Sequence, residues 1–319
     1  MIVRWGLEDL DPLLAELGIG NAFLVTSTRF AELELPVESR FTGVLRHAPL
    51  DVVEAAQEAA AAADGLVGVG GGSAIDTAKA VSAGTGLPLV AVPTTYAGSE
   101  WTSYFGMRDE ARRAKTGGGG AHTVAIVYEP RLTLDLPRDE SVGTAMNALA
   151  HCAEALYAGP CEDAGLGASL IGRALPAVVA DGSDVAARTA LLEGAMHSGR
   201  ALSERGLFLA HAMAQALGGR YAVSHGAANA LCLARALRFN AEAVPQALAT
   251  LADAMAAPDV LARIEELAGL GGFGRLRDLG VPEDELPDLA AETAERPGAR
   301  ANPRPVEPSD VERLFRSIW

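Results

Sequence analysis

The sequence is poor in cysteine and in positive charge, and each shortage argues against particular classes of protein. Its three cysteines, Cys152, Cys161 and Cys232, form neither a zinc-binding spacing nor a disulfide framework, which indicates a reducing cytoplasm. The formal net charge is −15, whereas binding to nucleic-acid phosphates requires clustered Lys and Arg. The same charge disfavours an anionic membrane surface. We therefore expect neither nucleic acid nor membrane as a partner.

The sequence also lacks long apolar runs and the layout of a secretory signal. No apolar run reaches the ~20 residues that span a bilayer, and the stretch from Met1 to Gly6 has no signal-peptide pattern. Hydrophobic residues make up 49% and charged residues 21% of the chain, as is typical of soluble globular proteins. At 319 residues the chain is long enough for two domains. We expect a cytoplasmic protein.

The first 139 residues alternate short apolar runs with helical patterns. We predict strands over 22–26, 41–45, 65–69, 87–92 and 123–128, and helices over 10–17, 51–64 and 73–83. Strands that alternate with helices imply a parallel sheet covered on both faces. The 51–64 helix is expected to present one face made of Val52, Ala55, Ala56 and Ala59. The polar, glycine-rich segment 98–120 predicts a mobile loop or a hairpin over a cofactor.

Residues 140–319 have a different texture. Long Ala- and Leu-rich helical patterns dominate, with breaks expected near Gly159, Gly182, Gly218 and Gly271. We therefore predict an α/β N-terminal domain over residues 1–139 and an all-α C-terminal domain over residues 140–319.

One glycine-rich turn follows a predicted strand and begins a predicted helix. It contains Gly70, Gly71 and Gly72, followed by Ser73. A helix N-terminus has unpaired N–H groups and about half a positive charge, so it attracts phosphate, and glycines let the backbone approach a pyrophosphate closely. Ser73 is expected to cap the helix or to add a hydroxyl donor. The glycines alone are equally typical of an ordinary strand-to-helix turn, because a GxGxxG-like pattern is weak by itself.

Polar side chains recur at helical spacing in the second half of the chain. Asn147 and His151 are four residues apart, His211 and Gln215 repeat that spacing, and His225 follows a glycine-rich turn. Residues i and i+4 share one face of a helix. A lone histidine in such an apolar context is usually a core residue, but three imidazoles together can also hold a divalent metal and leave a position open for substrate.

Together these motifs resemble the iron-containing (group III) alcohol dehydrogenases, and within that family most closely the maleylacetate reductases. The matching stretches are 70–79, 93–100, 146–157, 211–225 and 302–305, so the resemblance covers nearly the whole chain. It implies a Rossmann-like N-terminal domain that binds a dinucleotide, NAD(P), a helical C-terminal domain that carries catalytic and substrate-binding groups, and an active site between them.

The resemblance also implies roles for individual residues. It assigns cofactor binding to Gly70, Gly71, Gly72, Ser73, Asp76, Thr94, Thr95, Ser99, Thr102 and Lys115, with the three threonines on the nicotinamide side. It assigns catalytic roles to Asn147, His151, His211, His225 and Lys115. In metal-dependent relatives an Asp and three His bind iron or zinc, and the corresponding positions here are Asn147, His151, His211 and His225.

Three departures from the family pattern change what the resemblance implies. Asn147 replaces the metal-ligating Asp, and an amide binds divalent cations more weakly than a carboxylate does. Gln215 replaces a further histidine, which removes a titratable group. The segment 115–124 is shortened and rich in glycine, and a glycine-rich turn after Gly6 is missing. These changes put the proton relay, cofactor clamping and substrate specificity in question.

The expected reaction is hydride transfer from NAD(P)H to a carbonyl or activated alkene of a small, carboxylated substrate, without a metal. One of His151, His211 and His225 would then donate a hydrogen bond or proton to the developing negative charge on oxygen. Two alternatives stay open. One is a metal-dependent alcohol dehydrogenase, and the other is a non-redox lyase, cyclase or pseudoenzyme on the same fold.

The cofactor, substrate and assembly leave weaker patterns. Ser27 stands where relatives carry an acidic residue for the ribose, and Arg29 would meet a 2′-phosphate, so NADPH fits as well as NADH. Arg108, Arg112 and Arg113 would attract a carboxylate or are surface charges. Relatives are often dimers joined by strand addition near the N-terminus, so we expect a homodimer.

Overall fold

The computed structural model describes residues 1–109 and 114–319, and these form two compact units. Unit 1 comprises Met1–Thr95 and Ser99–Leu134, and unit 2 comprises Tyr96–Gly98 and Asp135–Trp319. The expected fold class is confirmed, because the first unit is a parallel sheet with helices and the second is helical. The expected division of cofactor binding and catalysis between the two parts of the chain stays a prediction.

Unit 1 is built on a sheet whose six strands are all parallel to their neighbours. The strand order is β1-β8-β5-β4-β2-β3. The strands are β1 (Ile2–Trp5), β2 (Ala22–Thr26), β3 (Ser39–Phe41), β4 (Gly65–Gly70), β5 (Leu89–Pro93) and β8 (Thr123–Tyr128). Every residue of β2, β4 and β5 is buried, as expected of central parallel strands, whose two faces are both covered by helices.

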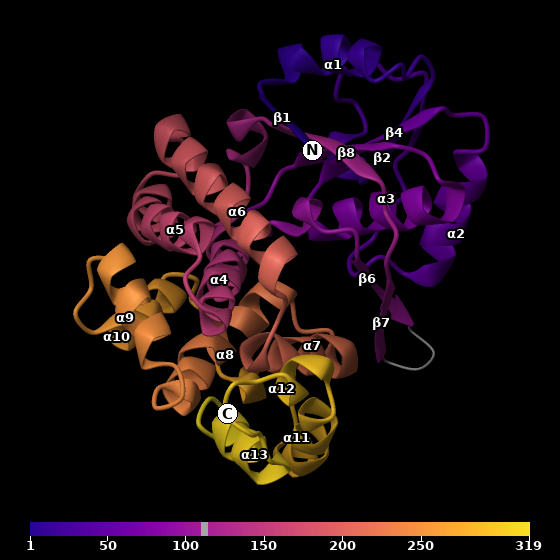
Figure 1. Cartoon of the computed structure of the whole chain (residues 1–319). Helices are drawn as coiled ribbons and strands as arrows, with labels where there is room; N and C mark the ends of the chain where they lie inside the picture. The colour runs from indigo at the N-terminus through magenta and orange to yellow at the C-terminus, as the bar shows by residue number, and fades with distance from the viewer. Residues whose placement is uncertain (110–113) are drawn as a thin grey trace. The chain divides into compact units, whose positions relative to one another are not determined.

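Three helices cover the two faces of this sheet: α1 (Leu10–Glu16), α2 (Leu50–Ala59) and α3 (Gly72–Thr85) (Figure 1). Alternate strand residues point to opposite faces. One core therefore joins α1 to Leu24, Val67, Val69, Val90 and Val92. The other core joins α2 and α3 to Phe23, Val25, Leu66 and Leu89. This arrangement leaves the carboxyl ends of the strands along one edge of the sheet.

A hairpin follows β5 and returns to the sheet at β8. Its strands, β6 (Phe105–Asp109) and β7 (Ala114–Gly118), pair antiparallel in a separate two-stranded sheet. This confirms the hairpin among the two structures expected for segment 98–120. Its placement over a cofactor stays a prediction.

Three details of the expected secondary structure in unit 1 were wrong. The edge strand β1 was not predicted, because four residues without alternation or a following turn give no strand pattern. Segment 41–45 is not a strand beyond Phe41, where β3 ends. The buried positions of α2 are Val53 and Ala56, followed by Ala60, so only Ala56 of the expected face is buried. An Ala-rich helix has little contrast between its faces, which makes the phase of burial hard to assign.

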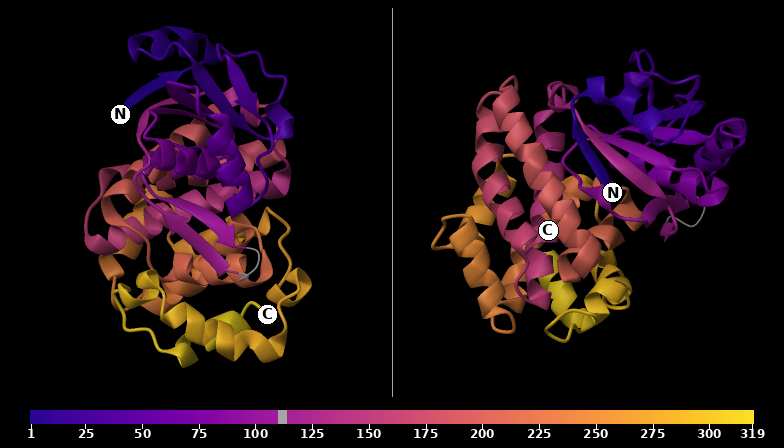
Figure 2. Two further views of the ribbon diagram at one scale, coloured as in Figure 1. Left: turned by 90° about the vertical axis from the view of Figure 1, so that its right-hand side faces the viewer. Right: turned by 45° about the horizontal axis from the view of Figure 1, so that its top comes forward.

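Unit 2 consists of helices. They are α4 (Arg138–Ala155), α5 (Glu162–Ala180), α6 (Val185–Arg205), α7 (Leu209–Tyr221), α8 (His225–Asn240), α9 (Pro245–Ala254), α10 (Val260–Gly269), α11 (Leu286–Ala294), α12 (Pro297–Arg300) and α13 (Pro308–Arg316) (Figure 2). Short 3-10 helices complete the two units: η1 (Leu7–Asp9), η2 (Thr28–Phe30), η3 (Ser99–Trp101), η4 (Pro130–Thr133), η5 (Leu156–Ala158), η6 (Leu276–Leu279) and η7 (Glu283–Glu285).

The core of unit 2 is organised around α4, which packs against α5, α6, α7 and α8. All residues of this helix from Ala145 to Ala155 are buried. The break expected near Gly218 is present but comes slightly later, because Gly218 and Gly219 lie inside α7 and the helix ends at Tyr221. The chain turns instead at Ala222, which has a left-handed φ of 56°. Gly218 and Gly219 are both buried.

Two glycines let α4 and α8 cross closely. A Cβ added to Gly226 would lie 2.6 Å from the carbonyl carbon of Gly143, and a Cβ on Gly143 would lie 3.1 Å from that of Gly226. Helices can approach this closely only where neither partner has a side chain at the crossing. One turn further along each helix, the crossing brings Asn147 next to Asn229.

Helix α5 has the length and hydropathy of a membrane span and is the one such helix in residues 1–109 and 114–319. It contains Arg173 and Pro176 and packs against α4, α6 and α9. A helix packed on several sides by other helices is typical of the core of a soluble protein. We therefore describe α5 as a core helix of unit 2.

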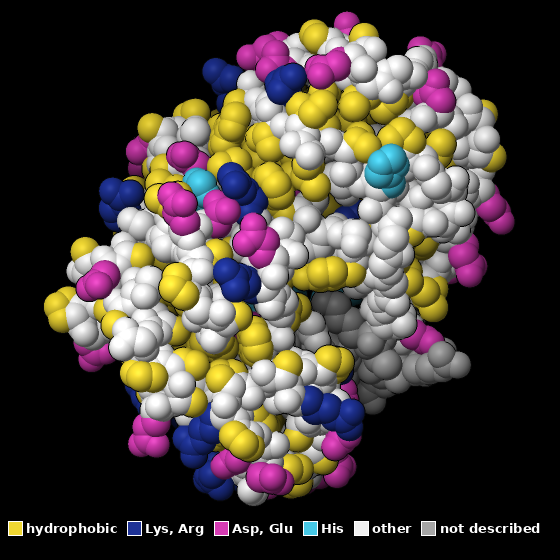
Figure 3. Space-filling view, viewed as in Figure 1, with side chains coloured by type: hydrophobic (Ala, Val, Ile, Leu, Met, Phe, Trp, Pro, Cys, Tyr) yellow, Lys and Arg dark blue, Asp and Glu magenta, His cyan; other side chains and the backbone are white. Residues whose placement is uncertain are grey.

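The surface carries charges of both signs. The chain has 41 acidic and 26 basic side chains, and on the face shown in Figure 3 the two kinds lie interspersed. Mixed charge with an acidic excess is typical of the surfaces of soluble proteins.

Candidate functional site

The glycine-rich turn lies where β4 ends and α3 begins, at the carboxyl edge of the sheet in unit 1. Gly70 has a φ of +144°, which side-chain-bearing residues rarely adopt. A Cβ on Gly71 would lie 2.9 Å from Cγ2 of Thr95. The turn is therefore a cradle that side chains would fill, at a helix N-terminus whose N–H groups attract phosphate. These residues fit the diphosphate of a dinucleotide.

Ser73 does not cap α3, contrary to one of its two expected roles. The residue at the N-cap is Gly71, and no side chain caps this helix end. The Ser73 hydroxyl oxygen instead accepts a hydrogen bond from the backbone N–H of His47 at 2.9 Å, which ties the turn to the segment before α2. Contact between Ser73 and a cofactor stays a prediction.

The end of β5 places Thr94 and Thr95 beside this turn. Gly70 pairs with Pro93 in the sheet, and the N–H of Thr94 donates to the Gly70 carbonyl at 2.9 Å. Dinucleotides bind across the carboxyl ends of neighbouring parallel strands. The two threonines therefore lie on the β5 side of the candidate phosphate site.

Asp76, Ser99 and Thr102 meet around a buried ammonium group, that of Lys79. Lys79 Nζ donates to the Ser99 carbonyl at 2.7 Å and to Thr102 Oγ1 at 3.1 Å, and it lies 3.4 Å from Asp76 Oδ1. Burial lowers the pKa of Lys79, an effect that Asp76 partly opposes. Asp76 and Thr102 are thus engaged by the protein itself. Any contact that they make with a cofactor stays a prediction.

The other candidates near the hairpin are less well placed. Lys115 lies in β7 opposite Arg108 of β6, but its side chain falls outside the described part of the structure. Arg108 is buried, so it is not the surface charge that the sequence also allowed. Arg112 and Arg113 lie outside the described residues.

The three imidazoles come together in unit 2, each from a different helix. His151 of α4 stacks on His211 of α7, with ring centroids 4.6 Å apart. The His211 ring centroid lies 5.7 Å from that of His225, the first residue of α8. Gln215, one turn after His211 on α7, is half-buried. The sequence placed Asn147 and His151 on one helical face, and the packing of α4, α7 and α8 gathers the remaining groups.

A buried carboxylate that sequence reasoning missed orients His211. Glu154 Oε2 accepts from His211 Nδ1 at 2.7 Å and from the N–H of Phe208 at 2.9 Å, while its Oε1 accepts from the N–H of Ala210 at 2.8 Å. Glu154 lies three residues after His151, on an otherwise apolar stretch of α4. An acidic residue in that position is the signal that could have revealed it.

Asn147 is held in one amide orientation by its neighbours. Its Nδ2 donates to the carbonyl of Ala97 at 3.1 Å, so its Oδ1 is the atom that lies 3.2 Å from His211 Nε2. The same Oδ1 accepts from Asn229 Nδ2 at 2.9 Å. Polar contacts therefore run from Glu154 through His211 and Asn147 to Asn229.

Asn229 contributes a buried hydrogen-bond acceptor to the cluster. Its Nδ2 is committed to Asn147 Oδ1 and to the carbonyl of His225 at 3.0 Å. Its Oδ1 is buried and has no hydrogen-bond partner among the described residues. An acceptor in this position is suited to a hydroxyl or water donor from outside the chain. Sequence reasoning also missed Asn229, because only the crossing of α4 and α8 brings it into contact with Asn147.

The surroundings of His151 disfavour a positive charge on its imidazole. Its Nδ1 lies 3.2 Å from Ser198 Oγ of α6. Burial, and secondarily the neighbouring His211, holds the pKa of His151 well below its ordinary value. A neutral imidazole can donate through one nitrogen and accept through the other.

Four positions correspond to the family's metal ligands: Asn147, His151, His211 and His225. Asn147 Oδ1 lies 3.2 Å from His211 Nε2, and the absence of a bound metal stays a prediction. An amide also lacks the charge of the carboxylate that it replaces. In the described part of the chain, no group of three or more His, Cys, Asp or Glu side chains is arranged to hold a metal ion.

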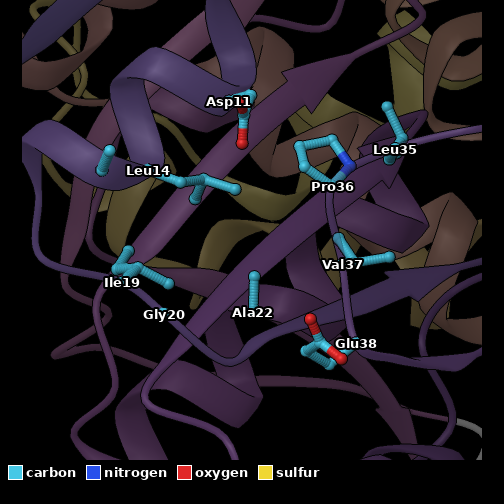
Figure 4. A pocket seen from close by; sticks show the side chains of 10 residues that line it. Asp11, Leu14, Ile19, Gly20, Ala22, Leu35, Pro36, Val37 and Glu38 are labelled. Atoms are coloured by element: carbon cyan, nitrogen blue, oxygen red, sulfur yellow. The ribbon is translucent and has the colours of Figure 1, made fainter.

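A pocket of about 370 Å³ in unit 1 lies at the amino ends of the strands, whereas the glycine turn lies at their carboxyl ends. Figure 4 shows its lining by Asp11, Leu14, Ile19, Gly20, Ala22, Leu35, Pro36, Val37 and Glu38. Ala22 begins β2 and pairs with Gly65, the first residue of β4, whereas the turn follows the last residue of β4. The pocket is therefore separate from the candidate site.

Comparison with known proteins agrees with this geometry. Residues 4–128 match the family described as iron-containing alcohol dehydrogenase, and residues 141–319 match the C-terminal part of the Fe-containing alcohol dehydrogenase family. A maleylacetate reductase of Pseudomonas knackmussii is 35% identical over 336 residues, covering 98% of this chain and 93% of the relative.

Two solved structures share the fold over the whole chain. A crystal structure of a maleylacetate reductase from Rhizobium sp. strain MTP-10005 aligns with a TM-score of 0.90 and 30% identity, covering 100% of this chain and 95% of the other. A crystal structure described as a putative alcohol dehydrogenase from Ralstonia eutropha JMP134 aligns with a TM-score of 0.93 and 32% identity, with the same two coverages.

Proposed function

Since the chain belongs to the iron-containing alcohol dehydrogenase family and is an NAD(P)H-dependent reductase, we propose that it reduces maleylacetate or a similar small unsaturated oxo acid without a metal. The metal-free part of the proposal depends on Asn147, which stands where metal-dependent relatives have a carboxylate. Its amide oxygen contacts His211 Nε2 and accepts a hydrogen bond from Asn229 Nδ2. The substrate class rests on the relatives, several of which are named maleylacetate reductases.

In this proposal unit 1 binds the cofactor. The backbone N–H groups at 70–73 and the N-terminus of α3 hold the diphosphate, and Thr94 and Thr95 lie on the side of the turn that takes the nicotinamide. Ser27 and Arg29 stand after β2, on the opposite side, where the adenosine ribose would lie. Because Ser27 brings no carboxylate to repel a 2′-phosphate, we expect NADPH to bind at least as well as NADH.

In this proposal side chains of unit 2 stabilise the negative charge that develops on the substrate oxygen. When bound, the nicotinamide supplies a hydride to an electron-poor carbon, which leaves negative charge on the conjugated carbonyl oxygen. That oxygen would take the place of Asn147 Oδ1 beside His211 Nε2, and His211, aligned by Glu154, would donate a hydrogen bond or proton to it. His151 and His225 flank His211 and exclude water from it. Asn229 Oδ1 accepts a hydrogen bond from the substrate or from a bound water.

The two alternatives considered from the sequence are less well supported. A non-redox lyase or cyclase is not favoured, because the related proteins carry reductase or dehydrogenase names. A metal-dependent alcohol dehydrogenase would have to bind its ion with the uncharged amide of Asn147 in place of a carboxylate. Elemental analysis of the purified protein and activity after exhaustive chelation decide this point. Activity that is lost on chelation and restored by added zinc or iron would overturn the metal-free proposal.

The proposal is tested by binding and turnover. We expect saturable binding of NADH and NADPH, followed by nicotinamide oxidation that depends on maleylacetate. Product formation without any nicotinamide, or failure of both dinucleotides to bind, would contradict it. We extend the proposal to a cytoplasmic homodimer, in which the outer edge of β1, at the end of the sheet, offers unpaired backbone groups to a second copy. Sedimentation analysis measures this state.

A further inference from the structure

Lys79 is an unusual residue in this chain. Of 26 Lys and Arg residues, Lys79 and Lys115 are the only lysines. Lys79 is also only 1% exposed, although a buried ammonium group is costly unless it is paired and hydrogen-bonded. The protein therefore places a compact cation at one buried position while it uses arginine almost everywhere else.

The contacts of Lys79 all converge on one segment. Its Nζ donates to the carbonyl of Ser99 at 2.7 Å, to Thr102 Oγ1 at 3.1 Å and to the carbonyl of Tyr104 at 2.5 Å. The Thr102 hydroxyl in turn lies 3.1 Å from the Ser99 carbonyl and 3.0 Å from the Tyr104 carbonyl. Three acceptors match the three protons of an ammonium group, whereas a planar guanidinium presents its donors in a fixed fork.

The partner of Lys79 extends this connection. Asp76 Oδ1 lies 3.4 Å from Lys79 Nζ, and Asp76 Oδ2 accepts from the N–H of Gly106 at 3.1 Å. Asp76 and Lys79 both belong to α3, whose first residue, Gly72, lies in the glycine turn. The helix that begins at the candidate diphosphate site thus holds segment 99–106 through two charged side chains.

We propose that Lys79 is a positioning residue for the nicotinamide half of the cofactor. By tying segment 99–104 to α3, it sets the distance between the diphosphate-binding turn and the wall of the site on the β5 side. This inference rests on the proposed function, and it concerns only the nicotinamide end. The diphosphate and adenosine end is held by the turn itself, which Lys79 does not contact.

The test separates the two ends of the cofactor by comparing NADH with ADP-ribose, which lacks the nicotinamide. Dissociation constants for both ligands are measured by calorimetry on Lys79→Met, Asp76→Asn and the wild type. We expect Lys79→Met to bind ADP-ribose as the wild type does but NADH more weakly. Its kcat should fall on the order of 10²-fold, the cost of a misplacement of about 1 Å between reacting groups.

A matched control is Ser82→Ala, which alters the same helix without touching segment 99–106. Ser82 is fully buried, and its hydroxyl donates to the Leu87 carbonyl at 2.7 Å and accepts from the N–H of His122 at 3.0 Å. It should lower the melting temperature while leaving the ratio of the two dissociation constants unchanged. If Lys79→Met does not fold, Asp76→Asn decides, because it keeps an acceptor for Gly106 and removes only the charge opposite Lys79.

The outcomes are distinguishable from failure of the proposed function. A wild-type protein that binds neither ligand contradicts cofactor binding altogether. The role of Lys79 alone is overturned if the wild type binds NADH and ADP-ribose but the variants weaken the binding of the two ligands in equal proportion. It is also overturned if the variants leave the ratio of the two dissociation constants and kcat unchanged. A rise in the ratio of the NADH to the ADP-ribose dissociation constant, with the ratio of Ser82→Ala unchanged, supports it.

Discussion

His211 Nδ1 lies 2.7 Å from Glu154 Oε2, and both side chains are almost completely buried. The same carboxylate accepts from the backbone N–H groups of Phe208 and Ala210, at the start of α7. Glu154 therefore stabilises the N-terminus of the helix that carries His211 and also fixes the orientation of its ring. One residue links the placement of the helix to the placement of the imidazole.

Glu154→Gln is expected to impair turnover more than cofactor binding. The neutral amide no longer offers a carboxylate to Nδ1 of His211, so the ring loses its fixed orientation, and kcat should fall by about 10² or more. Steady-state kinetics with NADH titration measures both quantities. Glu193→Gln, on the exposed face of α6, serves as control. Wild-type kcat in Glu154→Gln would show that orientation of His211 is unimportant.

His211→Ala removes the candidate donor itself. Loss of one preorganised donor to a developing oxyanion typically lowers the rate by about 10²–10³, and we expect that loss in kcat. NADH should still bind, because the diphosphate turn belongs to unit 1. Turnover equal to that of the wild type would assign the donor role to another residue.

Asn147→Asp restores the carboxylate that metal-dependent relatives have. Its charge beside His151 and His211 should attract a divalent ion, since three imidazoles and a carboxylate suit zinc or iron. After dialysis against zinc, we expect the Asn147→Asp variant to contain about one zinc ion per chain, as a complete site does. The wild-type protein should contain little zinc after the same treatment. Stoichiometric metal in the wild type would contradict the metal-free proposal.

Gly226→Ala should destabilise unit 2 at the crossing of α4 and α8. The added Cβ would lie 2.6 Å from the backbone of Gly143, and overpacking of this kind costs about 1–3 kcal/mol. The matched control is Gly165→Ala in α5, where a Cβ would meet nothing within 4 Å; this change should stabilise by about 0.5–1 kcal/mol. Thermal unfolding measures both. Equal melting temperatures for the two variants would mean that the crossing tolerates a side chain.

Glu100→Gln should change how stability depends on pH. Burial raises the pKa of Glu100, against the opposing hydrogen bond from the Tyr128 hydroxyl at 2.7 Å and the charge of Lys79. A raised pKa means that the folded state holds the proton more tightly. Its contribution to stability is therefore present below the model-peptide value of 4.5 and lost as the pH rises through the folded value.

Glutamine keeps an acceptor for Tyr128 but does not titrate. The melting temperature of Glu100→Gln relative to the wild type should thus increase from pH 4.5 upward and then level off. Melting curves across this range measure the difference. A melting-temperature difference that stays constant, or that shrinks as the pH rises, would show that burial does not disfavour the ionised form of Glu100.

Local patterns were sufficient for several parts of this protein. The strands at 22–26 and 123–128, the turn at 70–73 and the start of α3 follow from apolar runs bounded by glycine. The shared face of Asn147 and His151 follows from helical spacing alone. By contrast, the phase of α2 was misjudged because alanine at most positions gives no contrast between inside and outside.

The amino-acid sequence by itself determined the parallel α/β first part, the helical second part, the glycine turn at 70–73 and the family. These depend on interactions between residues a few positions apart, which short segments contain completely. Only the tertiary structure decided three contacts. Glu154 accepts a hydrogen bond from His211, Asn229 donates one to Asn147, and Lys79 donates hydrogen bonds to segment 99–104. Those contacts join residues 20 to 82 positions apart, and they exist only because particular helix faces pack together, a choice that no local pattern contains.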